Sequence, residues 1–232
     1  MIHAALDTSN GTAFAVCKNN KLLFHEFLDG TGRNSDQILV SWLVNSLKSI
    51  GLTVNDITNW TLGTGPGSFA GLRCGIAMIK GICLSSNATM RGVASSYALA
   101  RASKTSQNSS ETCGILNDGR HNQVLLSRFQ MKDNDWQLVD APIPLDPDSL
   151  LLPEYQCECW ATNQQELLPE LPEEITAKLQ SFQHLPADML LQNTSVIWPT
   201  QSIDMEKSCE PLYVRPAVFV KPHRLAAVAA GE

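Results

Sequence analysis

The sequence predicts an α/β fold, with central strands covered by helices. Two observations support this prediction. Over the first hundred residues, apolar segments of strand length alternate with segments of helical periodicity. A polar stretch at 104–112 then separates them from a second set of strands. Since 232 residues can form one large or two small domains, we expect an N-terminal unit at 1–105 and a C-terminal unit at 106–232.

The elements of the first unit follow from local patterns. Asn19-Asn20 is typical of a two-residue hairpin turn between strands. Asn34 or Ser35 can cap a helix whose apolar residues recur at helical spacing up to Ile50, and Ser68 can cap another. The expected strands are 2–6, 12–18, 21–28, 60–64 and 88–93, and the expected helices are 36–50, a second that opens at Ser68, and 95–103.

The second unit contains fewer clear signals. The turn Asn117-Asp118-Gly119-Arg120 separates two predicted antiparallel strands. The proline-rich stretch at 142–153 is typical of edge or loop structure. The remaining expectations are strands at 113–116, 122–130 and 157–162, and short helices at 174–182 and 187–193.

Composition and charge exclude several classes of protein. A net charge of −6 argues against a stand-alone nucleic-acid binder, because neutralising phosphates requires clustered lysine and arginine. The N-terminus has no basic region, carries Asp7 where a signal peptide would be apolar, and is followed by no run of about 18 apolar residues. We therefore expect a cytoplasmic protein with no membrane association, whose seven cysteines are buried free thiols.

The segment Gly63 to Gly81, GTGPGSFAGLRCGIAMIKG, belongs to a series of motifs that occur in one order along the chain. The others are LDTSNGTAFAV at the start, VASSYALA, DGRHNQV and PLYVRP near the end. This series resembles the TsaB (YeaZ) family, bacterial partners in threonylcarbamoyladenosine modification of tRNA. The likeness is loose between Met131 and Ser208, and Asn34-Ser35-Asp36 replaces the usual His-Ser-Glu.

The resemblance implies a two-domain fold of the actin/sugar kinase/Hsp70 class with a reduced second domain. It also implies a non-catalytic scaffold that pairs with the catalytic paralogue TsaD and works with the ATPase TsaE. That complex transfers threonylcarbamoyl to the adenosine beside the anticodon. This chain would then need no cofactor and would meet tRNA only through the complex.

A nucleotide-dependent phosphotransferase of the same fold is the alternative. Asp7, Thr8 and Ser9 follow the first strand, where a phosphate could meet hydroxyls and amides. The same residues often bond local backbone amides to end a strand, and we favour that interpretation. After Gly119 the next glycine is Gly231, so the second unit lacks the glycine turns that let a nucleotide approach the backbone.

Catalytic and metal-binding patterns are also missing. The five histidines are isolated in sequence, and the first predicted helix has no histidine pair at i and i+4. Cys157-x-Cys159 supplies two thiolates where zinc prefers four ligands. There is no G-x-S-x-G elbow. We expect no catalytic residues and no metal site.

The two long helices are the expected partner-binding surface. The Ser68 helix is apolar almost all round from Ala70 to Leu84, which predicts burial on two sides. The sheet would supply one side and TsaD the other, or a second copy when TsaD is absent. Ordinary core packing is the open alternative. The candidate partner-binding residues are Ser35, Ile38, Leu39, Trp42, Leu43, Gly71, Leu72, Gly75, Ile76 and Ile79.

Overall fold

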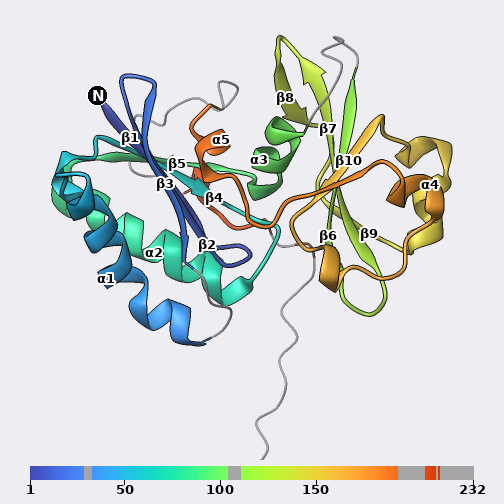
Figure 1. Ribbon diagram of the computed structural model, residues 1–232, viewed down its shortest axis with the longest axis horizontal. Coiled ribbons are helices and arrows are strands. Elements are labelled where there is room, and N and C mark those ends of the chain that lie inside the picture. The colour runs from blue at the N-terminus through green and yellow to red at the C-terminus, as the bar shows by residue number, and fades with distance from the viewer. Residues whose placement is uncertain (29–32, 104–110, 193–206, 213, 215–232) are drawn as a thin grey trace, which may run out of the picture.

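The computed structural model describes residues 1–28, 33–103, 111–192, 207–212 and 214. They form two lobes, each built on one β-sheet (Figure 1). The expected boundary between residues 105 and 106 lies outside the described residues.

The first sheet has the strand order β3-β2-β1-β4-β5. Strand β2 runs antiparallel to both of its neighbours, β1 and β3, whereas β1, β4 and β5 run parallel to one another. The predicted hairpin turn is confirmed, because Asn19 and Asn20 have φ of 51° and 64°. The strands are β1 (Ile2–Asp7), β2 (Thr12–Lys18), β3 (Lys21–Leu28), β4 (Asn59–Gly63) and β5 (Thr89–Val93).

Helices α1 (Arg33–Ser49) and α2 (Phe69–Ser86) lie side by side over one face of this sheet (Figure 1). A short turn, η1 (Val54–Asp56), follows α1. Helix α2 begins at the predicted cap: the Ser68 hydroxyl accepts a 3.2 Å hydrogen bond from the Gly71 amide. The core beneath the helices is apolar and centres on Phe14 and Trp60, whose rings stack with centroids 6.1 Å apart.

The second sheet has the order β11-β10-β6-β7-β8, with β9 paired to β7. Among the described residues, its outer face is covered by short helical segments, as a reduced second domain would be. The strands are β6 (Thr112–Asp118), β7 (Val124–Lys132), β8 (Asp135–Leu138), β9 (Ile143–Leu145), β10 (Cys159–Thr162) and β11 (Leu179–Ser181). The helical segments are η2 (Pro147–Leu151), η3 (Pro153–Tyr155), η4 (Gln165–Leu167) and α4 (Glu173–Thr176).

Two expectations for this lobe were wrong. The helix expected at 174–182 ends at Thr176, and the chain continues as β11, whose Leu179 pairs with Trp160 of β10. Tertiary pairing overrides local helix preference there. The sequence analysis also missed β8, which follows a left-handed turn at Asp133 and Asn134.

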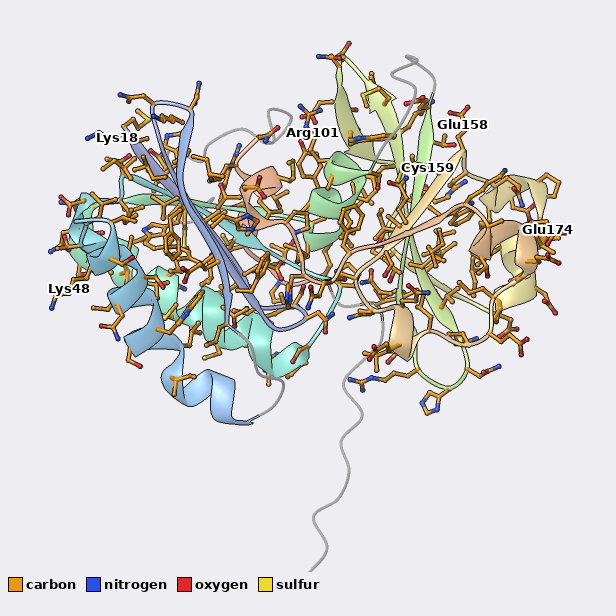
Figure 2. All side chains as sticks on the ribbon, in the orientation of Figure 1. Lys18, Lys48, Arg101, Glu158, Cys159 and Glu174 are labelled. Atoms are coloured by element: carbon orange, nitrogen blue, oxygen red, sulfur yellow. The ribbon has the colours of Figure 1, made fainter. Side chains whose placement is uncertain are left out.

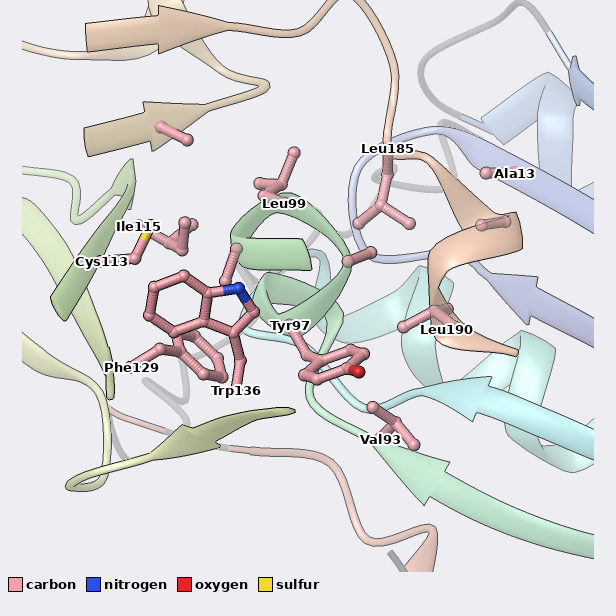
Figure 3. Packing of buried hydrophobic residues seen from close by; sticks show 14 of the residues in the cluster. Ala13, Val93, Tyr97, Leu99, Cys113, Ile115, Phe129, Trp136, Leu185 and Leu190 are labelled. Carbon is pink, nitrogen blue, oxygen red and sulfur yellow. The ribbon is translucent and has the colours of Figure 1, made fainter. Parts of the chain in front are cut away.

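A shared core joins the two lobes (Figure 3). Helices α3 (Ser95–Ala102) and α5 (Ala187–Leu190) lie between the sheets, and Tyr97 of α3 contacts Phe129 of β7 with centroids 6.4 Å apart. The second unit also returns to the first lobe. Helix α5 packs on β1 and β2, and the Leu212 amide donates a 2.8 Å hydrogen bond to the Thr64 carbonyl. The expected unit 106–232 therefore contributes residues to both lobes.

Candidate functional site

The turn after β1 holds a buried carboxylate, that of Asp7. One oxygen accepts bonds from the Ser9 amide at 2.9 Å and the Ser9 hydroxyl at 2.6 Å, and the other accepts one from the Ser95 hydroxyl. Burial raises the pKa of Asp7, and the bonds from Ser9 and Ser95 partly offset this effect. These three hydrogen bonds to the carboxylate all come from the protein's own groups.

The other two residues of the turn bond to the start of α2. The Thr8 hydroxyl donates a 2.8 Å bond to the Gly71 carbonyl, and the Ser68 amide donates a 2.6 Å bond to the Ser9 carbonyl. This is the local bonding that the sequence analysis favoured over phosphate binding. One of the free amides that would make the start of α2 an anion site is therefore occupied by the strand-end turn.

The glycines of α2 meet this same turn. A side-chain carbon on Gly75 would lie 2.5 Å from the Thr8 hydroxyl oxygen, and one on Gly71 would collide with the Thr8 carbonyl. The interpretation of Gly71 and Gly75 as a face for a partner helix was therefore wrong. They are small because the β1 turn packs against them.

Four of the other candidates also face inward. Leu39 and Leu43 of α1 and Leu72 and Ile79 of α2 are fully buried within the chain's own fold. They are core residues, which is the alternative that the sequence left open. Trp42 and Ile76 are half-buried against the first-lobe core, Ile38 is exposed, and the side chain of Ser35 lies outside the described residues.

The exposed face of α2 opposite the sheet is mostly apolar, although the exposed Arg73 interrupts it near the start of the helix. Small residues and one large one recur along it at helical spacing: Ala70, Ala77, Gly81 and Leu84. Leu84 is 75% exposed, and nothing lies within 4 Å of a side-chain carbon built on Gly81. We call these four residues the α2 stripe. None of the α2 residues that the sequence analysis named as candidates belongs to this stripe.

Both helices also expose apolar side chains outside the α2 stripe. Helix α1 exposes Ile38, Val40 and Val44, and Val40 is 58% exposed. At the start of α2 the Arg73 guanidinium lies 3.9 Å above the exposed Phe69 ring. By length and composition α2 could cross a membrane, with 22% of its residues buried. Its buried residues, however, lie in the core against β1 and β4, as in a helix of a globular fold.

The turn between β6 and β7 is bonded to the segment that follows β10. Arg120, His121 and Asn122 all have left-handed backbone, with φ between 52° and 61°. The Asp118 amide donates a 2.7 Å bond to the Gln164 side chain. Across the junction, the Asn10 side chain donates a 3.2 Å bond to the Asn163 carbonyl. These bonds join the ends of β1, β6 and β10 to one another.

Among the described residues, no group of three or more histidine, cysteine or acidic side chains could hold a metal ion. His223 lies outside them. All seven cysteines are free, and Cys157 and Cys159 are both buried.

A family model described as "TsaD: tRNA N6-adenosine threonylcarbamoyltransferase" matches residues 29–156, more than half of the chain. The TsaB protein of Escherichia coli K12, a tRNA threonylcarbamoyladenosine biosynthesis protein, is 26% identical over 117 residues. That match spans 50% of each chain, so it covers about half the length of this curated relative.

Two solved structures share the fold over most of the chain. YeaZ from Pseudomonas aeruginosa superposes with a TM-score of 0.65 at 21% identity, covering 91% of this chain and 99% of its own. A second, described as an uncharacterized protein similar to peptidase YEAZ from Pseudomonas aeruginosa, gives a TM-score of 0.66 at 21% identity. It covers 92% of this chain and 99% of its own.

Proposed function

Because the chain belongs to the TsaB (YeaZ) family, we propose that it is a non-catalytic partner in the biosynthesis of threonylcarbamoyladenosine in tRNA. Its fold is of the actin/sugar kinase/Hsp70 class, as the resemblance implied. In this proposal it scaffolds TsaD within a cytoplasmic complex that also contains the ATPase TsaE. When TsaD is absent, the chain forms a homodimer through the surface with which it would bind TsaD.

The α2 stripe is the observation that carries the proposal. An exposed helix face with Ala70, Ala77 and Gly81 lets another helix approach closely, and Leu84 supplies a large apolar contact. Helix α1 also exposes the apolar side chains of Ile38, Val40 and Val44. Contact between this surface and the corresponding helices of TsaD would bury both.

The turn after β1 supports a role without catalysis. In a phosphotransferase of this fold, such a turn would offer its hydroxyls and amides to a phosphate. Here Asp7, Thr8 and Ser9 bond to Ser95, Gly71 and Ser68 instead. A nucleotide would have to break these bonds before it could use the same groups.

The charge of the second lobe supports contact with tRNA only through the complex. No lysine or arginine occurs between Lys132 and Lys178, whereas aspartate and glutamate recur throughout this stretch. The labelled side chains of Glu158 and Glu174 lie at the periphery of the lobe (Figure 2). An acidic surface repels the phosphate backbone, so TsaD would supply the RNA contacts.

Co-elution with TsaD in size-exclusion chromatography with light scattering tests the proposal. We expect wild type to form a one-to-one complex, and Leu84→Arg to lose it because the charge would be buried at the interface. Leu167→Arg is the matched control, because Leu167 is also an exposed leucine but lies in η4 of the second lobe. Equal complex formation by both variants would refute the α2 stripe as the docking surface.

A calorimetric titration with ATP and magnesium separates the two function classes. A scaffold gives no turnover when the isolated chain is mixed with nucleotide. Binding accompanied by ATP hydrolysis or phosphate transfer would favour the phosphotransferase.

A further inference from the structure

Two cysteines face each other across parallel strands of the second lobe. Cys113 of β6 is the direct register partner of Cys159 of β10. Adjacent strands lie about 4.8 Å apart, which falls inside the Cα separations that a disulfide can span. Register partners also project to the same face of the sheet, and these two thiols are in hydrogen-bond contact. Both are free in this structure.

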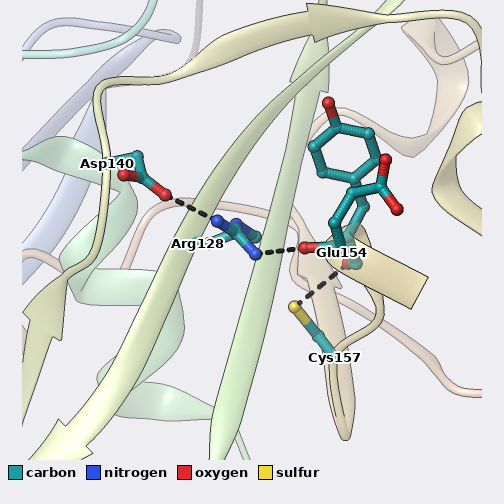
Figure 4. Close-up of polar contacts among 5 residues, drawn as sticks. Arg128, Asp140, Glu154 and Cys157 are labelled. Atoms are coloured by element: carbon teal, nitrogen blue, oxygen red, sulfur yellow. Dashed lines mark hydrogen bonds and ion pairs between the residues drawn. The ribbon is translucent and has the colours of Figure 1, made fainter. Parts of the chain in front are cut away.

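The neighbouring Cys157 has a different partner. Its thiol donates to the Tyr155 carbonyl at 3.6 Å, beside the contact between Arg128 and the Glu154 carbonyl (Figure 4). The Cys159 thiol donates to the carbonyl of Thr112, the residue before Cys113, at 3.8 Å. The strand register and the bond to Thr112 therefore place Cys159 beside Cys113, whereas the bond of Cys157 goes to Tyr155.

We propose that Cys113 and Cys159 are a redox-sensitive pair, which a hydroperoxide oxidises to a reversible disulfide between β6 and β10. This inference is independent of the function proposed above. It assigns a modification site to the second lobe, at a place that the α2 stripe does not touch.

The two thiols have unequal roles in the reaction. The hydrogen bond from Cys113 lowers the pKa of Cys159, whereas the same contact and burial raise the pKa of Cys113. Cys159 is also the more accessible of the two, at 8% exposed against 0%. Burial and the carboxylates of Glu111 and Glu158, the latter labelled in Figure 2, raise the pKa of Cys159 and partly offset the effect of Cys113. Cys159 is therefore the attacking sulfur.

The chemistry takes two steps. The Cys159 thiolate attacks one peroxide oxygen, the O–O bond breaks, and the departing oxygen takes a proton to leave as water or an alcohol. The Cys113 sulfur then attacks the sulfenic sulfur of Cys159; the S–S bond forms, the S–O bond breaks, and the hydroxyl leaves as water with the Cys113 proton. Two thiols are oxidised by two electrons in total, and one hydroperoxide is reduced.

The bond should be readily reversed. A small thiol reduces a disulfide by attacking one of its sulfurs, and the 8% exposure of Cys159 leaves that sulfur partly accessible. A reversible link suits a modification that responds to oxidant rather than one that holds the fold together.

Mass spectrometry of the oxidised full-length chain tests the proposal. The chain is treated with hydrogen peroxide, denatured in N-ethylmaleimide and digested without reductant. We expect a peptide linking Cys113 to Cys159, which dithiothreitol separates. Cys17 of β2 is the internal control, because it too is 8% exposed but lies in the other lobe. It should carry maleimide at peroxide doses that link the pair.

Two results would overturn the proposal. In the first, Cys113 and Cys159 both still carry maleimide at peroxide doses that already oxidise Cys17. In the second, Cys159 is linked to Cys157.

A variant tests which of the two sulfurs attacks first. In Cys113→Ala the sulfenic acid on Cys159 has no resolving thiol, so its dimedone adduct should increase at least about tenfold over wild type. An unchanged adduct level in the folded variant would contradict Cys159 as the attacking sulfur. If the variant does not fold, the linked wild-type peptide still decides whether the pair forms.

Discussion

The hydroxyl of Tyr97 donates a 2.6 Å hydrogen bond to the carboxylate of Asp135, and this bond joins helix α3 to strand β8. Both residues are buried. Asp135 also accepts a 2.8 Å bond from the Trp136 amide, and buried Arg91 of β5 interacts electrostatically with this pair. Tyr97 and Trp136 belong to the core that the two lobes share (Figure 3), so the bond fixes a buried carboxyl group next to that core.

Removing the Tyr97 hydroxyl should destabilise the protein. In Tyr97→Phe the ring still packs on Phe129, but the buried carboxylate loses one of its donors. Hydrogen bonds to charged groups contribute about 1.5–3 kcal/mol, and we expect a loss of that size in the free energy of unfolding. Urea denaturation measures it. A change below about 0.5 kcal/mol would show that the bond between the lobes contributes little.

An exposed ion pair in the second lobe should contribute much less. Arg128 lies 2.6 Å from Asp140, which is 56% exposed, and also bonds the Glu154 carbonyl (Figure 4). Water can replace these partners when the guanidinium is removed. We expect Arg128→Gln to lower the free energy of unfolding by at most about 1 kcal/mol. A loss as large as that of Tyr97→Phe, measured in the same urea series, would contradict this ranking.

Adding one methyl group should lower the stability of the protein at one glycine of α2 and raise it at another. Gly75→Ala places a carbon 2.5 Å from the Thr8 hydroxyl oxygen, so the turn or the helix must shift at a cost of about 1–3 kcal/mol. Gly81→Ala meets open space in a helix interior and should gain about 0.5–1 kcal/mol. Thermal unfolding of both variants provides the comparison. Equal effects would mean that the two faces of α2 do not differ.

The contrast between these glycines shows which features of the structure could be predicted from the sequence and which could not. The hairpin at Asn19-Asn20, the cap at Ser68 and the alternation of strands and helices have local signals, and the structure bears them out. The face of α2 that meets the sheet has no such signal, since the helix is apolar nearly all round. Only packing against Thr8 identifies Gly71 and Gly75 as inward-facing.

The second lobe shows the same limit at longer range. Strand β11 is specified by its pairing with β10 rather than by its own residues, so a helix was expected there. The return of α5 to the first lobe likewise depends on contacts with β1 and β2, more than 160 residues earlier in the chain. The turn before β8 was different, because Asp133-Asn134 resembles the Asn19-Asn20 turn and could have been recognised.

Ser95 should be needed for the turn between β4 and α2. Its hydroxyl donates to Asp7 and accepts a 2.8 Å bond from the Gly65 amide, all within a buried site. Ser95→Ala leaves one donor and one acceptor without these bonds, and we expect a loss of about 1–3 kcal/mol in unfolding free energy. Ser85→Ala is the control, because Ser85 is exposed on α2 and bonds only locally to the Ile82 carbonyl. Equal losses in the two variants would refute the role of Ser95.

Asp7 should make stability depend on pH in a direction that is unusual for a carboxylate. Burial raises its pKa in the folded state above the ordinary value of 3.8. Its contribution to stability is therefore fully present below pH 3.8 and is lost as pH rises through the folded-state pKa. Between pH 3.8 and the folded-state pKa, the free energy of unfolding should fall by at most about 1.4 kcal/mol per pH unit.

Asp7→Asn isolates the contribution of Asp7 ionisation, because the amide does not titrate. Like a protonated carboxyl, the amide keeps one acceptor for Ser9 and offers a donor to Ser95. Urea denaturation of both proteins from pH 4 to pH 7 gives the difference in unfolding free energy. Wild type should lose stability relative to the variant as pH rises. A difference that moved the opposite way would mean that the bonds from Ser9 and Ser95 outweigh burial and that Asp7 is charged in the fold.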